Sequence, residues 1–275
     1  MGLRINNNTA AFNSYRNLSI TDTQMGKSLE KLSSGFRINR AADDAAGLSI
    51  SEGLRSQVGG LKVAVRNAQD GVSVAQTAEG ALTEVTSMLQ RMRDLTVQAG
   101  NTGSNGGQSG EAVSSIQDEI TSLSTAINDI ATRTQFNGTK LLDGTSASLT
   151  FQVGANGGET QTVNLADMTS ATLAVDGVDV TANGTAADLT TIDAALKTVT
   201  TFRGQLGAAQ NTFEHTINNL NVAVENLSAS ESRIRDTDMA SEMVEFTRTQ
   251  ILSQAGTAML AQANQAPQNV LRLLQ

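Results

Sequence analysis

Apolar residues recur at alternating spacings of three and four over a long stretch in the C-terminal half of the chain. The series runs from Ile192 to Ile234 and is interrupted only at Arg203, Gln210 and Glu231. An average spacing of 3.5 residues gathers apolar side chains in a narrow stripe along one helix, and such a stripe packs on other helices. The pattern therefore predicts a long helix over residues 192–234. Its apolar positions are Ile192, Leu196, Val199, Leu206, Phe213, Ile217, Leu220, Val224, Leu227 and Ile234.

Two further stretches carry nearly the same spacing. They predict one helix over about residues 44–98 and a shorter one over about residues 111–132. Three stripes of matching period, far apart in the sequence, favour one elongated antiparallel helical bundle. Glycines inside the 44–98 stretch, among them Gly71 and Gly80, each cost up to about 1 kcal/mol relative to alanine. We therefore expect close backbone contacts or neighbouring chains to compensate for them.

Both ends of the chain carry shorter apolar stripes, each set off by a polar joint. The joints lie at residues 33–44 and 232–238, where Asp238 is a candidate helix N-cap, and the last helix is expected to end near Pro267. Segments of this length with few aromatic residues do not fold as an independent domain. We expect the two ends to pack on each other and on copies of the chain. The residues predicted to make these contacts are Leu18, Met25, Leu29, Leu32, Phe36, Met239, Met243, Phe246, Ile251, Leu273 and Leu274.

Between the helices the period changes to two. The Asn137-Gly138 dipeptide predicts a tight turn, the segments 149–153 and 160–165 predict a hairpin, and residues 174–180 suggest a further strand pair. The resulting fold is mainly α, with a small β-hairpin region and discontinuous domains built from both chain ends. We predict three parts, which are paired terminal helices at 1–42 and 236–275, a helical rod at 43–142 and 190–235, and a hairpin surface region at 143–189.

The composition leaves little room for catalysis. The chain has no cysteine and one histidine, His215, which lies two residues from stripe positions on either side and so points away from the stripe. A single histidine removes most metal and triad arrangements. The acidic pairs at residues 43–44 and 236–238 favour helix capping or pairing with arginines over cation binding. We expect no enzymatic activity, no cofactor and no metal.

Charge and hydropathy reduce the range of possible binding partners. The net charge of −8 argues against general nucleic-acid binding, and no stretch is apolar and long enough to suggest a membrane span. The first 20 residues lack the apolar run of a cleavable secretory signal. The N-terminal end is net positive and the C-terminal end net negative, which favours the pairing of the two ends.

Several motifs then resemble the bacterial flagellin family. At the N-terminal end these are LEKLSSGFRIN at residues 29–39 and AADDAAGLSI at 41–50. At the C-terminal end they are SRIRDTDMASE at 232–242, ILSQAGTAMLAQA at 251–263 and PQNVLRLL at 267–274. TQFNGTKLL at 134–142 and FQVGA at 151–155 resemble the hairpin region of the family. The resemblance covers roughly residues 1–165 and 190–275, and the short middle indicates a compact member without large outer domains.

The resemblance implies a subunit that polymerises into the flagellar filament for swimming motility, with terminal helices that fold on assembly. It further implies an extracellular location, export through the flagellar secretion channel without a cleaved signal peptide, and a chaperone that holds the C-terminal helix before export. Contacts with the filament cap and the hook-junction proteins follow as well.

Residues 89–95 and 116–120 resemble the stretch that the Toll-like flagellin receptor of hosts recognises. Carried over by position, the resemblance gives Arg91, Leu95 and Glu119 as contact candidates; the alternative is that this surface only packs subunits together. Two other functions stay open at this point. A flagellar junction or minor filament protein would share the terminal motifs, and a monomeric coiled-coil adhesin or secreted effector would explain the helical stripes alone.

Overall fold

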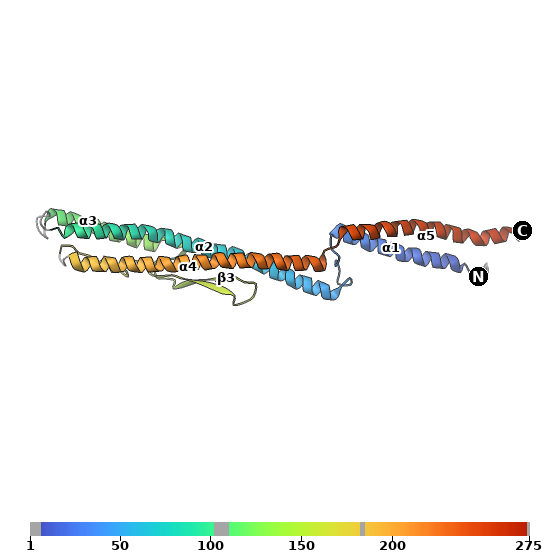
Figure 1. Cartoon of the computed structure of the whole chain (residues 1–275), viewed down its shortest axis with the longest axis horizontal. Helices are drawn as coiled ribbons and strands as arrows, with labels where there is room; N and C mark the ends of the chain where they lie inside the picture. The colour runs from blue at the N-terminus through green and yellow to red at the C-terminus, as the bar shows by residue number, and fades with distance from the viewer. Residues whose placement is uncertain (1–6, 102–109, 182–184, 274–275) are drawn as a thin grey trace. The chain divides into compact units, whose positions relative to one another are not determined.

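The computed structural model describes residues 7–101, 110–181 and 185–273, with side chains described over the same ranges except Thr185 and residues 266–273. Five helices and four short strands make up the described part (Figure 1). The helices are α1 (Thr9–Ser34), α2 (Ala45–Ala99), α3 (Glu111–Arg133), α4 (Thr185–Arg235) and α5 (Met239–Leu273). The strands are β1 (Gln135–Phe136), β2 (Thr139–Lys140), β3 (Ser148–Gln152) and β4 (Thr160–Asn164). The predicted mainly-α class is confirmed.

The chain forms two compact units. One combines the residues up to Ser56 with those from Asn226 onward, and the other contains residues 57–225. We call the first the terminal unit and the second the rod unit. The boundary between them falls inside α2 and α4, each of which contributes residues to both units. The division into three parts derived from the sequence stays a prediction.

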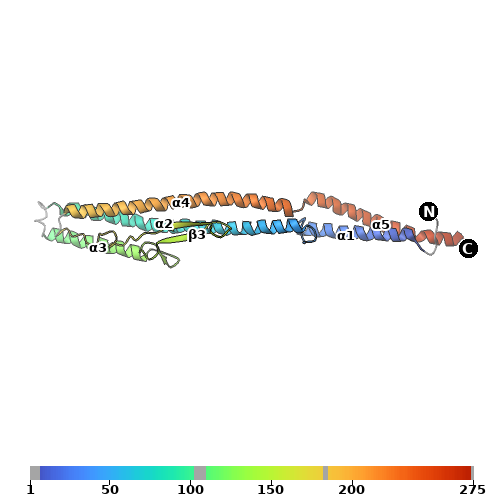
Figure 2. The same cartoon turned by 90° about the horizontal axis from the view of Figure 1, so that it is seen from below.

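The rod unit is held together by one apolar core that runs along α2, α3 and α4. Within this unit the three helices lie side by side (Figures 1 and 2). Contacts of Gly71 with Phe213 and of Arg93 with Asp193 show that α2 and α4 are antiparallel. Every stripe position predicted on α4 is buried or half-buried. The 3.5-residue spacing therefore predicted the buried face of this helix correctly.

A polar layer interrupts this core where the α4 stripe is interrupted in the sequence. Arg203 Nη2 lies 3.6 Å from Glu79 Oε1, and Gln210 Nε2 donates to Glu79 Oε2 at 3.3 Å. Both side chains on α4 therefore reach the same carboxylate on α2. A polar group at a stripe position favours one register of the two helices over the alternative registers, because a shift would leave the group without its partner.

The two hairpins pack against the helices of the rod unit. Asn137 and Gly138, both at positive φ, form the turn between β1 and β2, as the sequence predicted. The strands β3 and β4 pair antiparallel from Ser148 with Asn164 to Gln152 with Thr160. This hairpin contacts α4 through Phe151, whose ring meets Phe213 edge-on with centroids 5.6 Å apart. A two-stranded sheet is marginal alone, and the helices supply the missing surface.

Residues 165–181 correct one prediction, because they contain no strand pair. The segment runs through turns, and its apolar side chains enter the core of the rod unit. The backbone of this segment is hydrogen-bonded by the Gln117 side chain, which donates to Val178 O at 3.0 Å and accepts from Val180 N at 2.9 Å. The alternation of apolar and polar residues here means that every second side chain of a loop is buried. The loop is held by a glutamine side chain and pairs with no strand among the described residues.

Asp188, in the first turn of α4, is only 5 % exposed, and its Oδ2 has no hydrogen-bond partner among the described residues. Burial raises the pKa of its carboxyl; the N–H of Asp179 lowers that pKa, and the Asp179 charge raises it again. A folded pKa above the unfolded value means that the ionised group weakens the fold at neutral pH. Stability is regained as the pH falls through the folded pKa.

Asp188→Asn is therefore expected to raise the free energy of unfolding by about 1 kcal/mol at pH 7, because no charge is then buried. The gain should disappear once the pH falls below the unfolded aspartate pKa of about 3.9. Denaturant unfolding at several pH values measures it. The exposed Asp176 of the preceding segment provides the control, and Asp176→Asn should stay within about 0.5 kcal/mol at every pH. A gain that does not change with pH would contradict this account.

Candidate functional site

The candidate site is the terminal unit, in which α1 and α5 lie side by side (Figure 2). The Asn8 side chain caps α1 by accepting a hydrogen bond from Ala11 N at 3.0 Å. The helix ends at Gly35, which adopts φ +76° and donates its N–H to Lys31 O. Asp238 caps α5 by accepting from Ala240 N at 2.9 Å, as predicted. Local sequence therefore fixes where both helices begin and where α1 ends.

The described positions at which α1 and α5 face each other form what we call the seam. They follow a heptad spacing, but small and polar residues occupy many of them. Among the described side chains of the two helices, only Ser28 and Thr249 are buried, and both carry a hydroxyl group. The remaining facing positions are half-buried. They are Ala11, Ser14, Leu18, Thr21, Met25 and Leu32 on α1 and Glu242, Phe246, Ser253, Gly256, Leu260 and Ala263 on α5.

Polar contacts set the antiparallel register of this pair. Asn8 Nδ2 donates to Ala263 O at 2.7 Å near one end, and Ser253 Oγ donates to Asp22 Oδ1 at 2.9 Å in the middle. Near the other end Lys31 Nζ lies 3.5 Å from Glu242 Oε2.

Gly256 marks the point of close approach between the two helices. A Cβ at this position would lie 3.2 Å from Leu18 Cδ1, tighter than ordinary contact. Glycine therefore lets the helices pack closely where the seam offers few large side chains.

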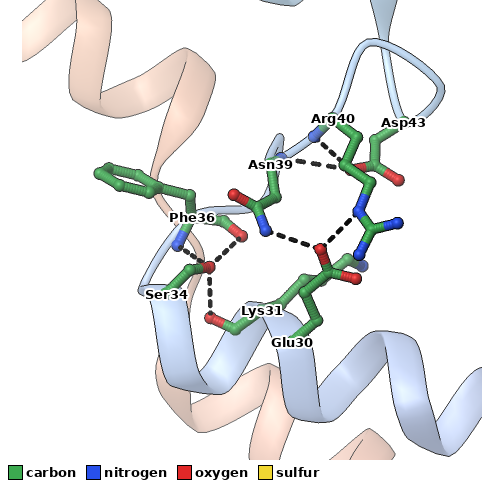
Figure 3. A network of polar contacts seen from close by, with 7 residues as sticks. All are labelled: Glu30, Lys31, Ser34, Phe36, Asn39, Arg40 and Asp43. Atoms are coloured by element: carbon green, nitrogen blue, oxygen red, sulfur yellow. Dashed lines mark hydrogen bonds and ion pairs between the residues drawn. The ribbon is translucent and has the colours of Figure 1, made fainter.

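The joint after α1 is held by two carboxylates (Figure 3). Glu30 Oε1 accepts from Asn39 Nδ2 at 2.7 Å and from Arg40 Nε at 2.8 Å. Asp43 Oδ2 accepts from Arg40 N at 2.9 Å and from Asn39 N at 3.2 Å. These two N–H groups lower the pKa of the Asp43 carboxyl below its ordinary value. The turn at residues 39–43 is thus held by charged acceptors at ordinary pH.

The two joints of the chain pair with each other inside the terminal unit. Phe36 and Asp236 form an antiparallel bridge, with Arg37 N donating to Arg235 O at 2.7 Å and Thr237 N donating to Gly35 O at 3.0 Å. The Arg235 guanidinium lies 4.7 Å from the centre of the Phe36 ring. Arg235 also reaches Glu52 Oε1 at 2.6 Å. The motif residues of the two chain ends therefore form one connected structure.

Three of the four acids at the joints hold helix ends or turns, as the sequence favoured, whereas Asp236 accepts a hydrogen bond from Ser232 Oγ at 2.5 Å. Asp44 Oδ1 accepts from Gly47 N at 2.8 Å at the start of α2, while Asp43 and Asp238 cap their own turns. Among the described residues no group of three or more His, Asp or Glu side chains could hold a metal ion. The described helices also include none that is long and apolar enough to cross a membrane.

The outer faces of α1 and α5 carry many large apolar side chains that the described residues of the subunit leave exposed. Phe12 is 71 % exposed and Ile251 is 60 % exposed. The others on these helices are Tyr15, Ile20, Leu29, Met239, Met243, Val244, Leu252 and Met259. A group of such residues far exceeds the single exposed apolar residues that ordinary surfaces show. These outer faces are the feature that a binding partner would cover.

The residues predicted to make self-assembly contacts separate into two groups. The first group is half-buried at the α1–α5 seam or at the joint and contains Leu18, Met25, Leu32, Phe36 and Phe246. The second group is exposed and contains Leu29, Met239, Met243 and Ile251. The side chain of Leu273 and the whole of Leu274 lie outside the described residues. The prediction missed Ser28, Thr249, Ser253 and Gly256, because small and polar seam positions give no apolar signal. The last helix also continues to Leu273 instead of ending near Pro267, since one missing N–H did not stop it.

The receptor candidates lie in the rod unit. Arg91 Nε on α2 and Glu119 Oε1 on α3 form an exposed ion pair at 2.8 Å, and this hydrogen bond raises the pKa of Arg91. Leu95, in contrast, is only 2 % exposed and belongs to the core. Arg91 and Glu119 are therefore accessible at the surface of the described rod unit, whereas Leu95 is buried by its neighbours. The assignment of all three residues as receptor contacts stays a prediction.

Comparisons with known proteins agree with this architecture. Residues 5–147 match the family described as the bacterial flagellin N-terminal helical region, and residues 189–274 match the bacterial flagellin C-terminal helical region. A flagellin of Bacillus subtilis (strain 168) is 51 % identical over 305 aligned residues, covering 99 % of this chain and 100 % of that protein. A flagellin of Halalkalibacterium halodurans is 54 % identical over 273 residues, covering 98 % and 99 %.

A solved structure shows the same fold at greater distance. The crystal structure of Bacillus cereus flagellin is 30 % identical and superposes with a TM-score of 0.50, covering 56 % of this chain and 88 % of that one. Two terminal family matches and two nearly full-length relatives exclude an unrelated coiled-coil protein. The chain therefore belongs to the bacterial flagellin family, as a compact extracellular structural subunit of the flagellar filament that assembles with copies of itself and is not an enzyme.

Proposed function

We propose that α1 and α5 become stably ordered only when the subunit joins the filament, so that folding of the chain ends and polymerisation are one step. One observation carries this proposal, which is that the described side chains of these helices bury two hydroxyl residues fully and no apolar residue. Ordering a residue costs about 1–2 kcal/mol of backbone entropy. A pair without a buried apolar core offers little to offset that cost.

The distribution of apolar residues around α5 supports the same conclusion. Phe246 and Leu260 face α1, whereas Val244 and Ile251 lie on the opposite side of the helix and are exposed. Large apolar residues that gather on the side of a helix away from its partner normally mark a second contact surface. Since α1 covers only one side of α5, neighbouring copies of the chain are the surfaces that would cover the remainder.

Amide hydrogen exchange of the free subunit and of the filament tests the proposal. In the free subunit the amides of α1 and α5 should exchange fast, while the core amides of α2, α3 and α4 in the rod unit exchange slowly. In the filament all five helices should exchange slowly. Tyr15 is the single tyrosine of a chain without tryptophan, so its fluorescence should change on polymerisation. Slow exchange of α1 and α5 in the free subunit would overturn the proposal.

We extend the proposal to the steps before assembly. An exposed apolar helix end aggregates unless another protein holds it, so an export chaperone would bind α5 in the cytoplasm and release it at the flagellar secretion channel. Membership of the family supports this route and the contacts with the cap and hook-junction proteins at the filament ends. Chaperone-bound subunits should resist limited proteolysis within α5. Unchanged cleavage there would argue against α5 as the binding segment.

A second candidate function is recognition by a host Toll-like flagellin receptor. The observation that favours it is the exposed Arg91–Glu119 pair, which presents both charges on neighbouring helices of the rod unit. A matched control exists in Arg93 and Asp193, which form an equally short and similarly exposed pair between α2 and α4.

The two pairs make a direct comparison. Replacing Arg91 and Glu119 by alanine should lower receptor activation by monomers roughly tenfold or more, because charged contacts contribute about 1.5–3 kcal/mol each. Replacing Arg93 and Asp193 should change activation by less than roughly twofold. Equal effects of the two double variants would remove the assignment.

A further inference from the structure

Methionine is the only sulfur-containing residue of this chain, which has eight methionines and no cysteine. In the rod unit Met92 is fully buried and Met168 is 2 % exposed. Met25 and Met88 are half-buried. Among the methionines that the structure describes, the three that are well exposed lie on α5 and are Met239, Met243 and Met259. Exposure of the methionine residues therefore differs sharply between the core of the rod unit and the outer faces of α5.

The exposed thioethers lie beside the face that α5 turns toward α1. Their exposed fractions are 48 % for Met239, 50 % for Met243 and 63 % for Met259. Met243 follows the seam residue Glu242, and Met259 precedes the seam residue Leu260. The two side chains thus flank the helix contact on either side and extend the apolar surface of α5 to both of its neighbouring faces.

We propose that these three methionines form a peroxide-sensitive site that blocks polymerisation of the unassembled subunit when oxidised. Hydrogen peroxide transfers one oxygen to the thioether sulfur, which is oxidised by two electrons to a sulfoxide, and the remaining oxygen leaves as water. The reverse step requires a dithiol reductant, which removes the oxygen as water and becomes a disulfide. Neither step involves another side chain of the protein.

The sulfoxide changes the chemistry of the face that carries it. A flexible apolar side chain becomes a polar one with a strong hydrogen-bond acceptor. Covering that acceptor with an apolar neighbour leaves it without a partner, which costs free energy. The inference rests on the proposed function, because it requires that neighbouring copies cover α5 in the filament. Oxidised subunits would then be excluded from growth until they are reduced.

Peptide mapping of the free full-length subunit after limited peroxide treatment tests the selectivity. Met239, Met243 and Met259 should be oxidised roughly tenfold faster than Met92 and Met168, which serve as internal controls. Equal rates at all five positions would overturn the proposal. Met25 reports separately on the proposed function. Oxidation of Met25 at the rate of the α5 methionines supports an open helix pair in the free subunit, whereas strong protection of Met25 contradicts coupled folding and leaves the oxidation site standing.

Seeded polymerisation tests the consequence. Peroxide-treated subunits should require a roughly tenfold higher concentration to extend filament fragments, and treatment with the two methionine sulfoxide reductases plus a dithiol should restore growth. The test is made in a Met25→Leu background, so that oxidation between α1 and α5 does not contribute. Adding Met239→Leu, Met243→Leu and Met259→Leu to this background should make the treated and untreated samples polymerise alike. Met243→Gln, which mimics the polarity of the sulfoxide, should weaken growth without oxidant. The proposal is overturned if the sulfoxidised Met25→Leu subunit grows at the untreated concentration, or if the variant with all four substitutions loses growth as the Met25→Leu subunit does.

Discussion

Replacing Phe213 by alanine should lower the free energy of unfolding of the rod unit by about 3–5 kcal/mol. The side chain is fully buried, contacts the hairpin through the edge-on Phe151 ring, and fills the space above Gly71 on α2. The deletion would leave a cavity where α2, α4 and the β3–β4 hairpin meet. Chemical denaturation followed by circular dichroism measures the loss.

At Gly71 the effects of packing and of helix propensity on stability have opposite signs, so a substitution there distinguishes them. A Cβ at this residue would lie 2.7 Å from Phe213 Cζ and 2.9 Å from Cε1. Gly71→Ala should therefore destabilise the rod unit by about 1–3 kcal/mol through overpacking, although alanine alone would favour the helix by about 1 kcal/mol.

Gly80 in the same helix provides the control, because a Cβ there meets nothing within 4 Å. Gly80→Ala should stabilise the unit by about 0.5–1 kcal/mol. A shift of the same sign and size in both variants would show that the ring contact does not decide the outcome.

Most of the rod unit could be predicted from the apolar spacing, because its buried face is built from Leu, Ile, Val and Phe. Ile192, Val199, Leu206 and Phe213 are all buried as predicted. Where burial and hydrophobicity coincide along a helix, the period alone identifies the contact face. The Asn137-Gly138 turn was predictable for a related reason, since few residue pairs adopt two successive positive φ angles.

The terminal unit was harder to predict because burial and hydrophobicity do not coincide there. The stripe through Leu29 predicted a contact with the other chain end or with copies of the chain; in the subunit Leu29 is exposed and its neighbour Ser28 is buried. A seam made of small and polar residues gives no apolar period, so the sequence pattern selects the larger residues beside it. The mismatch carries information of its own, since it indicates a surface that copies of the chain would cover.

The loop at residues 165–181 shows a different limit. Its buried valines alternate with polar residues as in a strand, but the hydrogen bonds of Val178 and Val180 go to the Gln117 side chain. A sequence period reports which side chains are buried and leaves the partner of the backbone undetermined. Only the position of α3 beside this loop decides between a strand and a turn.

A charge at Ile251 should nearly abolish polymerisation. Ile251 lies on the side of α5 opposite the seam, 60 % exposed and next to Leu252 in a row with Val244. If neighbouring copies cover this row, Ile251→Asp would bury a carboxylate without a partner, at a cost of several kcal/mol. A loss of about 2.7 kcal/mol per contact corresponds to a roughly 100-fold higher concentration for filament growth. Sedimentation after seeding measures that concentration.

The matched control is Val97→Asp on α2, where an apolar residue of similar exposure, 52 %, stands without the apolar row that surrounds Ile251. Single exposed apolar residues are ordinary surface features, so this variant should raise the growth concentration by less than roughly fivefold. Both variants should keep the melting transition of the rod unit, because neither side chain belongs to its core. Growth of the Ile251→Asp subunit at the wild-type concentration would mean that the outer face of α5 stays uncovered in the filament, and coupled folding of the chain ends would then lack its driving force.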